Sequence, residues 1–187
     1  MLRRLARLFT LKAFAKDERG VSAIEFAMVA PLLIMAYLGL AELTLGMMAS
    51  RRTSHLAATI GDLAAQSENL TDANITDLWA IGSSMIQPFA TSPLKMRLTC
   101  VTMTSNLAKV QWSKGYNGLT AYGNGNTIAS ITTAQISNGE SLMMTEVQYH
   151  YTSPFGDFMP EVFDGQRDFN DIFYHHPRNG AAVTNKN

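Results

Sequence analysis

A long uncharged stretch near the N-terminus constrains this chain more than any other feature. The run "FAMVAPLLIMAYLGLA", residues 26–41, carries no charge, and after Glu42 a second uncharged run continues to Ser50, before two arginines. A helix needs about 20 apolar residues to span a bilayer, so the first run alone is slightly short, whereas residues 21–50 are long enough. The stretch therefore predicts one membrane-spanning helix over residues 21–50.

Two glutamates lie inside this stretch, Glu25 and Glu42. With a helical rise of 1.5 Å per residue they are about 25 Å apart, which fits one glutamate near each membrane interface. A carboxylate near hydrocarbon costs about 2.5–3.5 kcal/mol on insertion scales, so a functional interpretation is the default. The alternative, that Glu25 is incidental and its side chain reaches water at the interface, stays open.

The charges are distributed unevenly along the chain. Residues 1–20 carry a net charge of +4 and the remaining residues a net charge of −4. The positive-inside rule then predicts a cytoplasmic N-terminus and an exported segment from residue 51 to 187. A secretory signal peptide is the rival, but "LGMMASRR" after the apolar run offers no small-residue cleavage site. The body has no basic patch, which argues against nucleic acid as a partner.

Gly20 lies directly before the predicted span and has no side chain to obstruct a protease. A cut between Gly20 and Val21 would remove the basic leader and create a new α-amino group. Val21 and Glu25 are four residues apart and share one helix face. A carboxylate in the first turn is also favoured by the helix dipole, by about 0.3–1 kcal/mol. We therefore expect Glu25 to neutralise the amino terminus of a neighbouring copy.

The segment "RGVSAIEFAMVAPLL" resembles the processing and helix motif of the TadE/TadF-like pseudopilins of the Tad (tight adherence, Flp) pilus. The motif positions are Gly20, Glu25, Phe26 and Pro31. The resemblance implies that a prepilin peptidase, an aspartyl protease of the membrane, cuts after Gly20. Because the chain continues far beyond the helix, it implies a minor pseudopilin acting in pilus initiation or assembly, and so in adhesion and secretion, rather than a major pilin.

The same resemblance implies partners and a location. The partners are the prepilin peptidase, the major pilin, other pseudopilins of the machinery and the lipid of the inner membrane. The protein is expected in the bacterial inner membrane with a periplasmic C-terminal domain, or incorporated in the pilus. The segments "SLMMTEVQYHYTSPFG", residues 141–156, and "HHPR", residues 175–178, are similar to later parts of TadE-like proteins. An uncleaved, single-pass, membrane-anchored periplasmic binding domain is the alternative.

The sequence patterns of the exported part, residues 51–187, predict an α+β head. The domain boundaries that we expect are a cleaved leader over 1–20, the membrane helix over 21–50, a helical stem and second helix over 51–90, and a β-rich part over 91–187. The resemblance to pilin-like proteins implies a lollipop shape for this arrangement. Pro31 removes one helical hydrogen bond inside the span and predicts a kink.

Local patterns place the elements of the head. Helical spacing continues to residues 66–69, and a second helix with Thr71 as N-cap is expected to stop at Pro88. The remaining expectations are a strand over 94–100, a turn at Ser105–Asn106, an exposed loop over 113–127, a turn at Asn138–Gly139, a strand over 142–152 and a short strand near 172–174. The apolar residues change parity after Cys100, which indicates a bulge or a face buried on both sides. Residues 128–136 match neither period.

Nothing in the head has the spacing of a catalytic or metal site. His175 and His176, near His150 and three aspartates, lack a recognised ligand spacing, and a solvated histidine pair is the better interpretation. The lone Cys100 is expected to be a small buried hydrophobe. The sequence therefore predicts a structural or assembly protein that is not an enzyme and has no cofactor and no metal.

Overall fold

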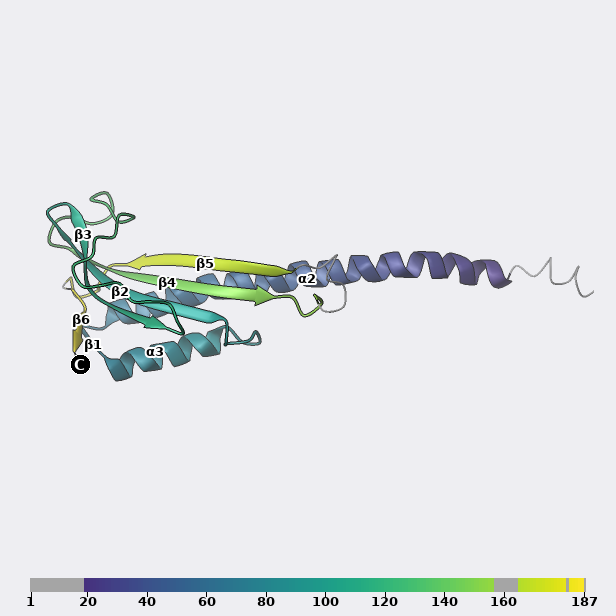
Figure 1. The fold of residues 1–187 in the computed structure, drawn as a ribbon, viewed down its shortest axis with the longest axis horizontal. Helices are drawn as coiled ribbons and strands as arrows, with labels where there is room; N and C mark the ends of the chain where they lie inside the picture. The colour runs from purple at the N-terminus through teal and green to yellow at the C-terminus, as the bar shows by residue number, and fades with distance from the viewer. Residues whose placement is uncertain (1–18, 157–164, 181, 187) are drawn as a thin grey trace, which may run out of the picture. The chain divides into compact units, whose positions relative to one another are not determined.

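The structure, a computed structural model, describes residues 19–156, 165–180 and 182–186 and divides into two compact units, Met1–Leu43 and Thr44–Asn187 (Figure 1). The elements are, in chain order, α2 (Arg19–Gln66), β1 (Asn69–Thr71), α3 (Asp72–Met85), β2 (Leu94–Thr104), β3 (Leu107–Tyr116), β4 (Ser141–Thr152), β5 (Gln166–His175) and β6 (Thr184–Lys186). A long apolar N-terminal helix followed by an antiparallel sheet confirms the predicted α+β class. The predicted end of the long helix near residue 66 is confirmed as well.

Helix α3 begins at the predicted N-cap. The Thr71 hydroxyl oxygen accepts a hydrogen bond from the backbone N–H of Asn74 at 3.2 Å, and the Asn74 side chain accepts one from the backbone N–H of Thr71 at 3.1 Å. This reciprocal box satisfies two N–H groups that a helix start leaves without partners. The helix ends at Met85, earlier than the predicted stop at Pro88. Proline disfavours helical geometry in the residue before it, here Gln87, so the helix ends before this residue. The Gln87–Pro88 peptide bond is cis.

Four strands form an antiparallel sheet in the order β3-β2-β4-β5. The register between β2 and β3 shifts between Cys100 and Val101, which confirms the bulge, one of the two alternatives indicated by the change of parity. Ser105 and Asn106 join β2 to β3 with positive φ angles of 52° and 63°, so the predicted turn is confirmed too. Two residues with positive φ match the right-handed twist of the flanking strands, which is why such turns favour tight hairpins.

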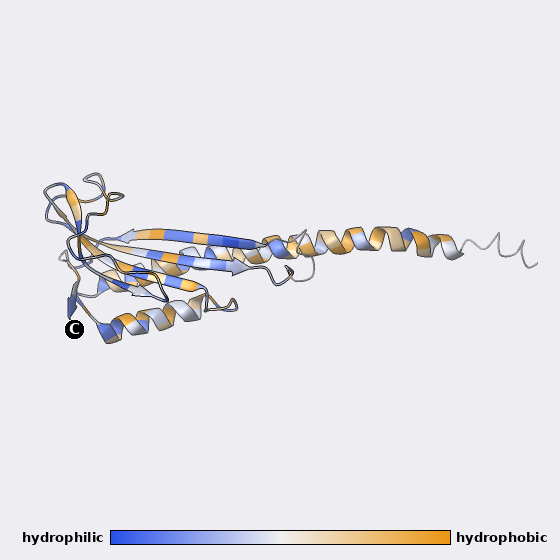
Figure 2. Ribbon diagram, in the orientation of Figure 1, coloured by the Kyte–Doolittle hydropathy of each residue, from blue (hydrophilic) through white to orange (hydrophobic). Residues whose placement is uncertain are grey.

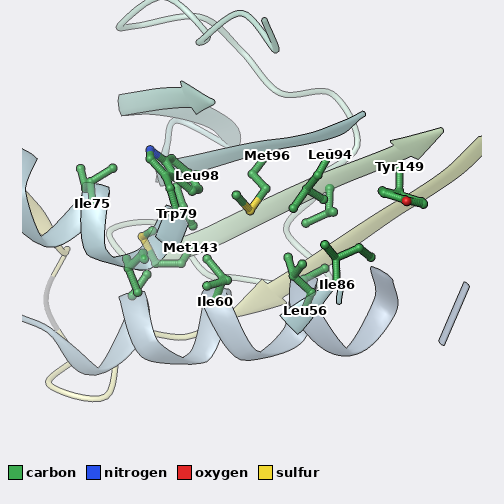
Figure 3. Packing of buried hydrophobic residues seen from close by; sticks show 14 of the residues in the cluster. Leu56, Ile60, Ile75, Trp79, Ile86, Leu94, Met96, Leu98, Met143 and Tyr149 are labelled. Carbon is green, nitrogen blue, oxygen red and sulfur yellow. The ribbon is translucent and has the colours of Figure 1, made fainter. Parts of the chain in front are cut away.

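The main core lies between one face of this sheet and the helices of the second unit (Figure 3). Leu56 and Ile60 of α2 and Trp79 of α3 face the even-numbered side chains of β2. The sheet and the end of α3 contribute Ile86, Leu94, Met96, Leu98, Cys100, Met143, Val147, Tyr149 and Tyr151. Each large side chain buried in this way stabilises the fold by about 1.5–3 kcal/mol before the entropy of ordering is counted. The buried side chains Ile75, Leu78 and Trp79 make one face of α3 part of this core.

A smaller core covers part of the opposite face of the sheet. The bulge turns Val101 and Met103 of β2 toward this side, where they meet Val110 of β3. The segment 128–136, which matches no regular period, supplies the cover through Ile128, Ile131 and Ile136. A segment that packs by three isolated isoleucines without a helix or strand cannot show a period, which explains why its pattern was uninformative.

Two strands differ from the sequence prediction. β3 continues to Tyr116, so residues 113–116 belong to a strand and not to the predicted exposed loop. β5 covers Gln166–His175, much more than the short strand predicted near 172–174. Both are the outer strands of the sheet, where charged and polar side chains are common and hide the strand pattern.

Residues near the C-terminus form hydrogen bonds with the end of α2. The backbone N–H of Arg178 donates to the Ala65 carbonyl at 3.0 Å, and its guanidinium donates to the Asp62 carboxylate at 2.8 Å. The hydrogen bond from Arg178 lowers the pKa of Asp62 below its ordinary value. Farther along, β6 pairs with β1 as a parallel two-stranded sheet. The indole N–H of Trp112 donates to the Val183 carbonyl at 2.6 Å, so the tail is held at both the helix and the sheet.

A buried ion pair ties the long connection after β3 to the sheet. The Arg97 guanidinium contacts the Glu146 carboxylate at 2.6 Å, and the side chain of each is only 11% exposed. Arg97 also donates to the Thr120 carbonyl at 2.7 Å and lies 3.7 Å from the centre of the Tyr122 ring. The Tyr122 hydroxyl contacts the same carboxylate at 3.2 Å. The charges of Arg97 in β2 and Glu146 in β4 therefore neutralise each other, and the connection after β3 adds hydrogen bonds through Thr120 and Tyr122.

Replacing Arg97 with Met is expected to lower the free energy of unfolding by about 3 kcal/mol, because it leaves Glu146 buried without its cation. The double variant Arg97→Met/Glu146→Leu is expected to regain most of this loss, because no charge then remains buried. Denaturant unfolding of the full chain in detergent micelles, followed by the fluorescence of Trp79 and Trp112, measures both changes. A single variant as stable as the wild type contradicts the expectation.

Gly61→Ala is expected to destabilise the second unit. A Cβ at Gly61 would lie 2.5 Å from Nδ1 of His175 and 2.6 Å from Oγ1 of Thr145, where Thr145 is fully buried in β4. Overpacking of this kind costs about 1–3 kcal/mol and outweighs the better helix propensity of alanine. The matched control is Gly20→Ala, where a Cβ meets nothing within 4 Å. Equal unfolding midpoints for the two variants would show that the contact at Gly61 is not restrictive.

Candidate functional site

The candidate site is the N-terminal part of α2, residues 19–43, taken by itself. Its large apolar side chains are exposed on every side of the helix: Phe26 is 71% exposed, Met28 76% and Tyr37 72%. Figure 2 shows orange as the dominant colour along this part of α2. A helix that is hydrophobic all round belongs in a protein core or in lipid, and this one is covered by no core within its own unit.

Length and composition agree with this exposure. Among the described residues, one helix is long and apolar enough to cross a membrane, within Gly20–Gln66. Its most apolar window has a mean hydropathy of 2.0, and none of that window is buried. Water-soluble monomers rarely expose an apolar surface of this extent. The helix therefore fits a membrane anchor, and the choice of membrane and the orientation stay predictions.

Gly20 lies in the first turn of α2, and the bond to Val21 is part of that turn. A Cβ at this position would have open space, with nothing within 4 Å. Val21 is 51% exposed. No close contact or special backbone angle of the described chain therefore requires a glycine at position 20. The predicted leader, residues 1–18, lies outside the described residues.

Glu25 and Phe26 occupy the same exposed part of the helix. Glu25 lies one helical turn after Val21 and so shares its face, as predicted from the spacing. Within the described residues Glu25 makes no hydrogen bond and no ion pair. Its carboxylate is consequently available to a group from another molecule. Phe26 points into the surroundings and contributes apolar surface beside the acidic side chain.

Pro31 lies inside α2, which continues on both sides of it. Because proline has no N–H, the carbonyl of Ala27 lacks its usual helical donor. Membrane helices tolerate such a gap, since neighbouring helices, Ser/Thr side chains and local adjustments of the backbone satisfy the freed carbonyl. The structure thus keeps the proline within one helix, and the predicted kink stays a prediction.

Gly61 is a packing position of the helix that the sequence analysis did not identify. It lets α2 approach the side chains of Thr145 and His175. A second fixed contact is the hydrogen bond from the Ser54 hydroxyl to the Asp171 carboxylate at 2.9 Å. A glycine inside an otherwise good helix was the available signal for close packing.

His175 and His176 do not form a solvated pair, so that interpretation was wrong for His175. Nδ1 of His175 is buried and has no hydrogen-bond partner among the described residues, while His176 is exposed. Burial lowers the pKa of His175, with Asp62 acting in the opposite direction. The described part of the chain contains no group of three His, Cys, Asp or Glu side chains placed to hold a metal ion. Cys100 is fully buried, as predicted, and burial raises its pKa to about 11, which leaves an unreactive thiol.

Comparison with known proteins bears on this same helix. Residues 20–61 match the family model described as TadE-like protein. The match begins at Gly20 and contains Glu25, Phe26 and Pro31, the positions on which the resemblance rests. No curated protein and no solved structure matches the chain. The match agrees with the recognition made from the motif: residues 20–61 of this chain are similar to TadE-like proteins.

Proposed function

We propose that this protein is a minor pseudopilin of the Tad pilus, cut between Gly20 and Val21 by a prepilin peptidase. It then remains in the inner membrane through α2 and takes part in pilus initiation or assembly. The TadE-like family is associated with pili and is structural rather than catalytic, which supports a role without chemistry of its own. The observation that carries the proposal is the combination, on one exposed helix, of an unobstructed glycine and an acidic side chain that has no partner among the described residues.

The surroundings of Gly20 support cleavage at that bond. A protease binds its substrate in an extended form, so the first helical turn has to open before the bond to Val21 can be cut. Glycine disfavours the helix by about 1 kcal/mol relative to alanine, and a first turn frays easily. Because the space around Gly20 is open, no neighbouring part of the described chain has to move first.

The position of Glu25 supports a role after cleavage. The new α-amino group of Val21 lies on the helix face of Glu25, so two copies packed side by side can pair the amine of one with the carboxylate of the other. Such a pair of charges at 4 Å is worth about 4 kcal/mol at the effective dielectric of a protein surface. That amount is comparable to the penalty of placing the carboxylate near lipid, so pairing explains why a charge is tolerated there.

The exposed apolar surface supports the proposed partners. Leu32, Leu33 and Ile34 are 63%, 60% and 55% exposed, so this part of α2 can contact lipid first and pilin helices later. The prepilin peptidase, the major pilin and other pseudopilins are the expected protein partners. Packing between membrane helices depends on such contacts because lipid itself gives no hydrophobic driving force.

One feature favours the alternative of an uncleaved, membrane-anchored binding domain. A polar cavity of about 310 Å³ lies at the sheet, lined by Pro93, Lys95, Gln148, Tyr149, His150, Asp168 and Asn170. The His150–Asp168 contact of 2.7 Å forms one wall. A small polar ligand fits such a cavity, but the cavity gives no reason for the pattern around Gly20. The cleavage experiment separates the two functions.

Gly20→Ala is expected to block leader removal, because the added methyl group obstructs the protease while leaving the fold unchanged. In cells with the prepilin peptidase, N-terminal sequencing of the wild type should begin at Val21, and in cells without it at the original N-terminus. The alanine variant should keep its leader in both. Persistence of the full-length wild type in both strains would refute the proposal and favour the alternative.

Glu25→Gln is expected to leave the protein inserted and cleaved while reducing surface pili at least tenfold, because the neutral amide cannot pair with the α-amino group. Pilus counts by electron microscopy measure the effect, and membrane fractionation checks insertion. Glu68→Gln is the matched control, since Glu68 lies beyond the end of α2 and a glutamine there can still accept the hydrogen bond from Asn179. Wild-type piliation in the Glu25 variant would rule out the pairing role.

A further inference from the structure

An open pocket lies immediately after the predicted end of the membrane span. Met48, Arg51, Arg52 and His55 of α2 and Met85 at the end of α3 line it, and its volume is about 530 Å³. All five residues belong to the second compact unit. The lining combines two apolar side chains with three nitrogen-rich ones, a composition that suits a ligand with an acidic group and an apolar portion.

The basic side chains of the pocket have different tasks. Arg52 donates through Nη1 to the Met85 carbonyl at 3.1 Å. This carbonyl is one of the last of α3 and has no donor within the helix, so Arg52 serves the fold. Arg51 and His55 are exposed and make no hydrogen bond or ion pair within the described residues. Their N–H groups are therefore available to a ligand.

The place of the pocket along α2 determines what it can meet if α2 is the membrane anchor of the proposed function, on which this inference rests. Arg51 directly follows the predicted span, and His55 is one helical turn further, about 6 Å along the axis. The polar layer on each side of the hydrocarbon core is about 5–8 Å thick. Both side chains emerge beyond the apolar part of α2, and their length lets them reach back toward the lipid phosphates.

Charge selects among the possible ligands. The chain from residue 21 to its end has a net charge of −4, so the adjacent pair Arg51–Arg52 is a local exception. A guanidinium binds phosphate oxygens through two parallel N–H groups, and an imidazole N–H adds a third donor. Met48, which is 37% exposed, and Met85 can adapt to the glycerol and the first methylenes of a lipid.

We propose that this pocket binds the phosphate headgroup of an acidic phospholipid at the membrane surface. Arg51 and His55 bind the phosphate, and Met48 and Met85 contact the apolar part. A lipid with a net negative charge is preferred over a zwitterionic one, whose ammonium group is repelled by the arginines. The bound lipid thereby fixes how far α2 emerges from the bilayer before the head begins.

The test uses the full chain in detergent micelles and counts retained lipids by native mass spectrometry. Phosphatidylglycerol is expected to bind more tightly than phosphatidylcholine, and Arg51→Gln is expected to weaken phosphatidylglycerol binding about fivefold. His55→Gln should give a smaller loss. Lys186→Gln is the matched control, because it removes the same charge from an exposed position on β6 that lines neither this pocket nor the cavity at the sheet. Unchanged fluorescence of Trp79 and Trp112 verifies that each variant is folded.

Three lipid-binding results overturn the inference: equal retention of the two lipids, an equal loss in the Lys186 variant, or displacement of the lipid by millimolar inorganic phosphate, which would indicate a site for free phosphate. A change of oligomeric state in Arg51→Gln with no change in lipid binding would assign the pocket to a second copy instead. Failure of the proposed function is seen separately, as an uncut leader or as release of the chain from membranes by alkaline carbonate.

Discussion

A single helix has to satisfy two different environments, and this constraint determines most of the structure. Residues 21–43 of α2 expose apolar side chains all round, whereas from Ala49 onward one side of the helix is buried against other elements. In lipid an isolated segment has to satisfy its backbone hydrogen bonds internally, which leaves the helix as its only choice. In the head the same helix is stabilised by packing. The backbone is therefore helical throughout α2, and only the surroundings of its side chains differ between the two parts.

In the head, both faces of the four-stranded sheet are covered by hydrophobic cores. The bulge between Cys100 and Val101 lets a single strand, β2, contribute to the core beneath the helices and then to the smaller core on the other face. The second core is closed by an irregular segment, and irregular segments cost entropy when they are ordered. The Arg97–Glu146 pair offsets this cost by binding the start of that connection through Thr120 and Tyr122.

The sequence predicted those features whose cause is local. Thr71 caps its helix through the residue three positions on, and Ser105–Asn106 turns the chain by its own backbone angles. The sequence did not predict the features that depend on contacts with a segment far away in the chain. The length of β5 depends on pairing with β4, and the tail is fixed by contacts of Arg178 with Asp62 and Ala65 more than a hundred residues away. The burial of Nδ1 of His175 has the same kind of cause, since this atom lies against Gly61 of α2.

The motif of the candidate site is contiguous and so could be recognised in the sequence, but the motif alone did not separate a glycine required by packing from one without an internal role. Gly20 and Gly61 occur in one helix, and each lowers helix propensity by a similar amount. At Gly61 the loss is offset by close packing, because a Cβ there would meet two side chains of the sheet at 2.5 and 2.6 Å. At Gly20 the described chain offers no such compensation, since nothing lies within 4 Å. Gly20 therefore lowers helix propensity without a packing contact in the described chain that offsets the loss. This favours a requirement imposed by another molecule, and a protease that needs an unobstructed first turn fits such a requirement.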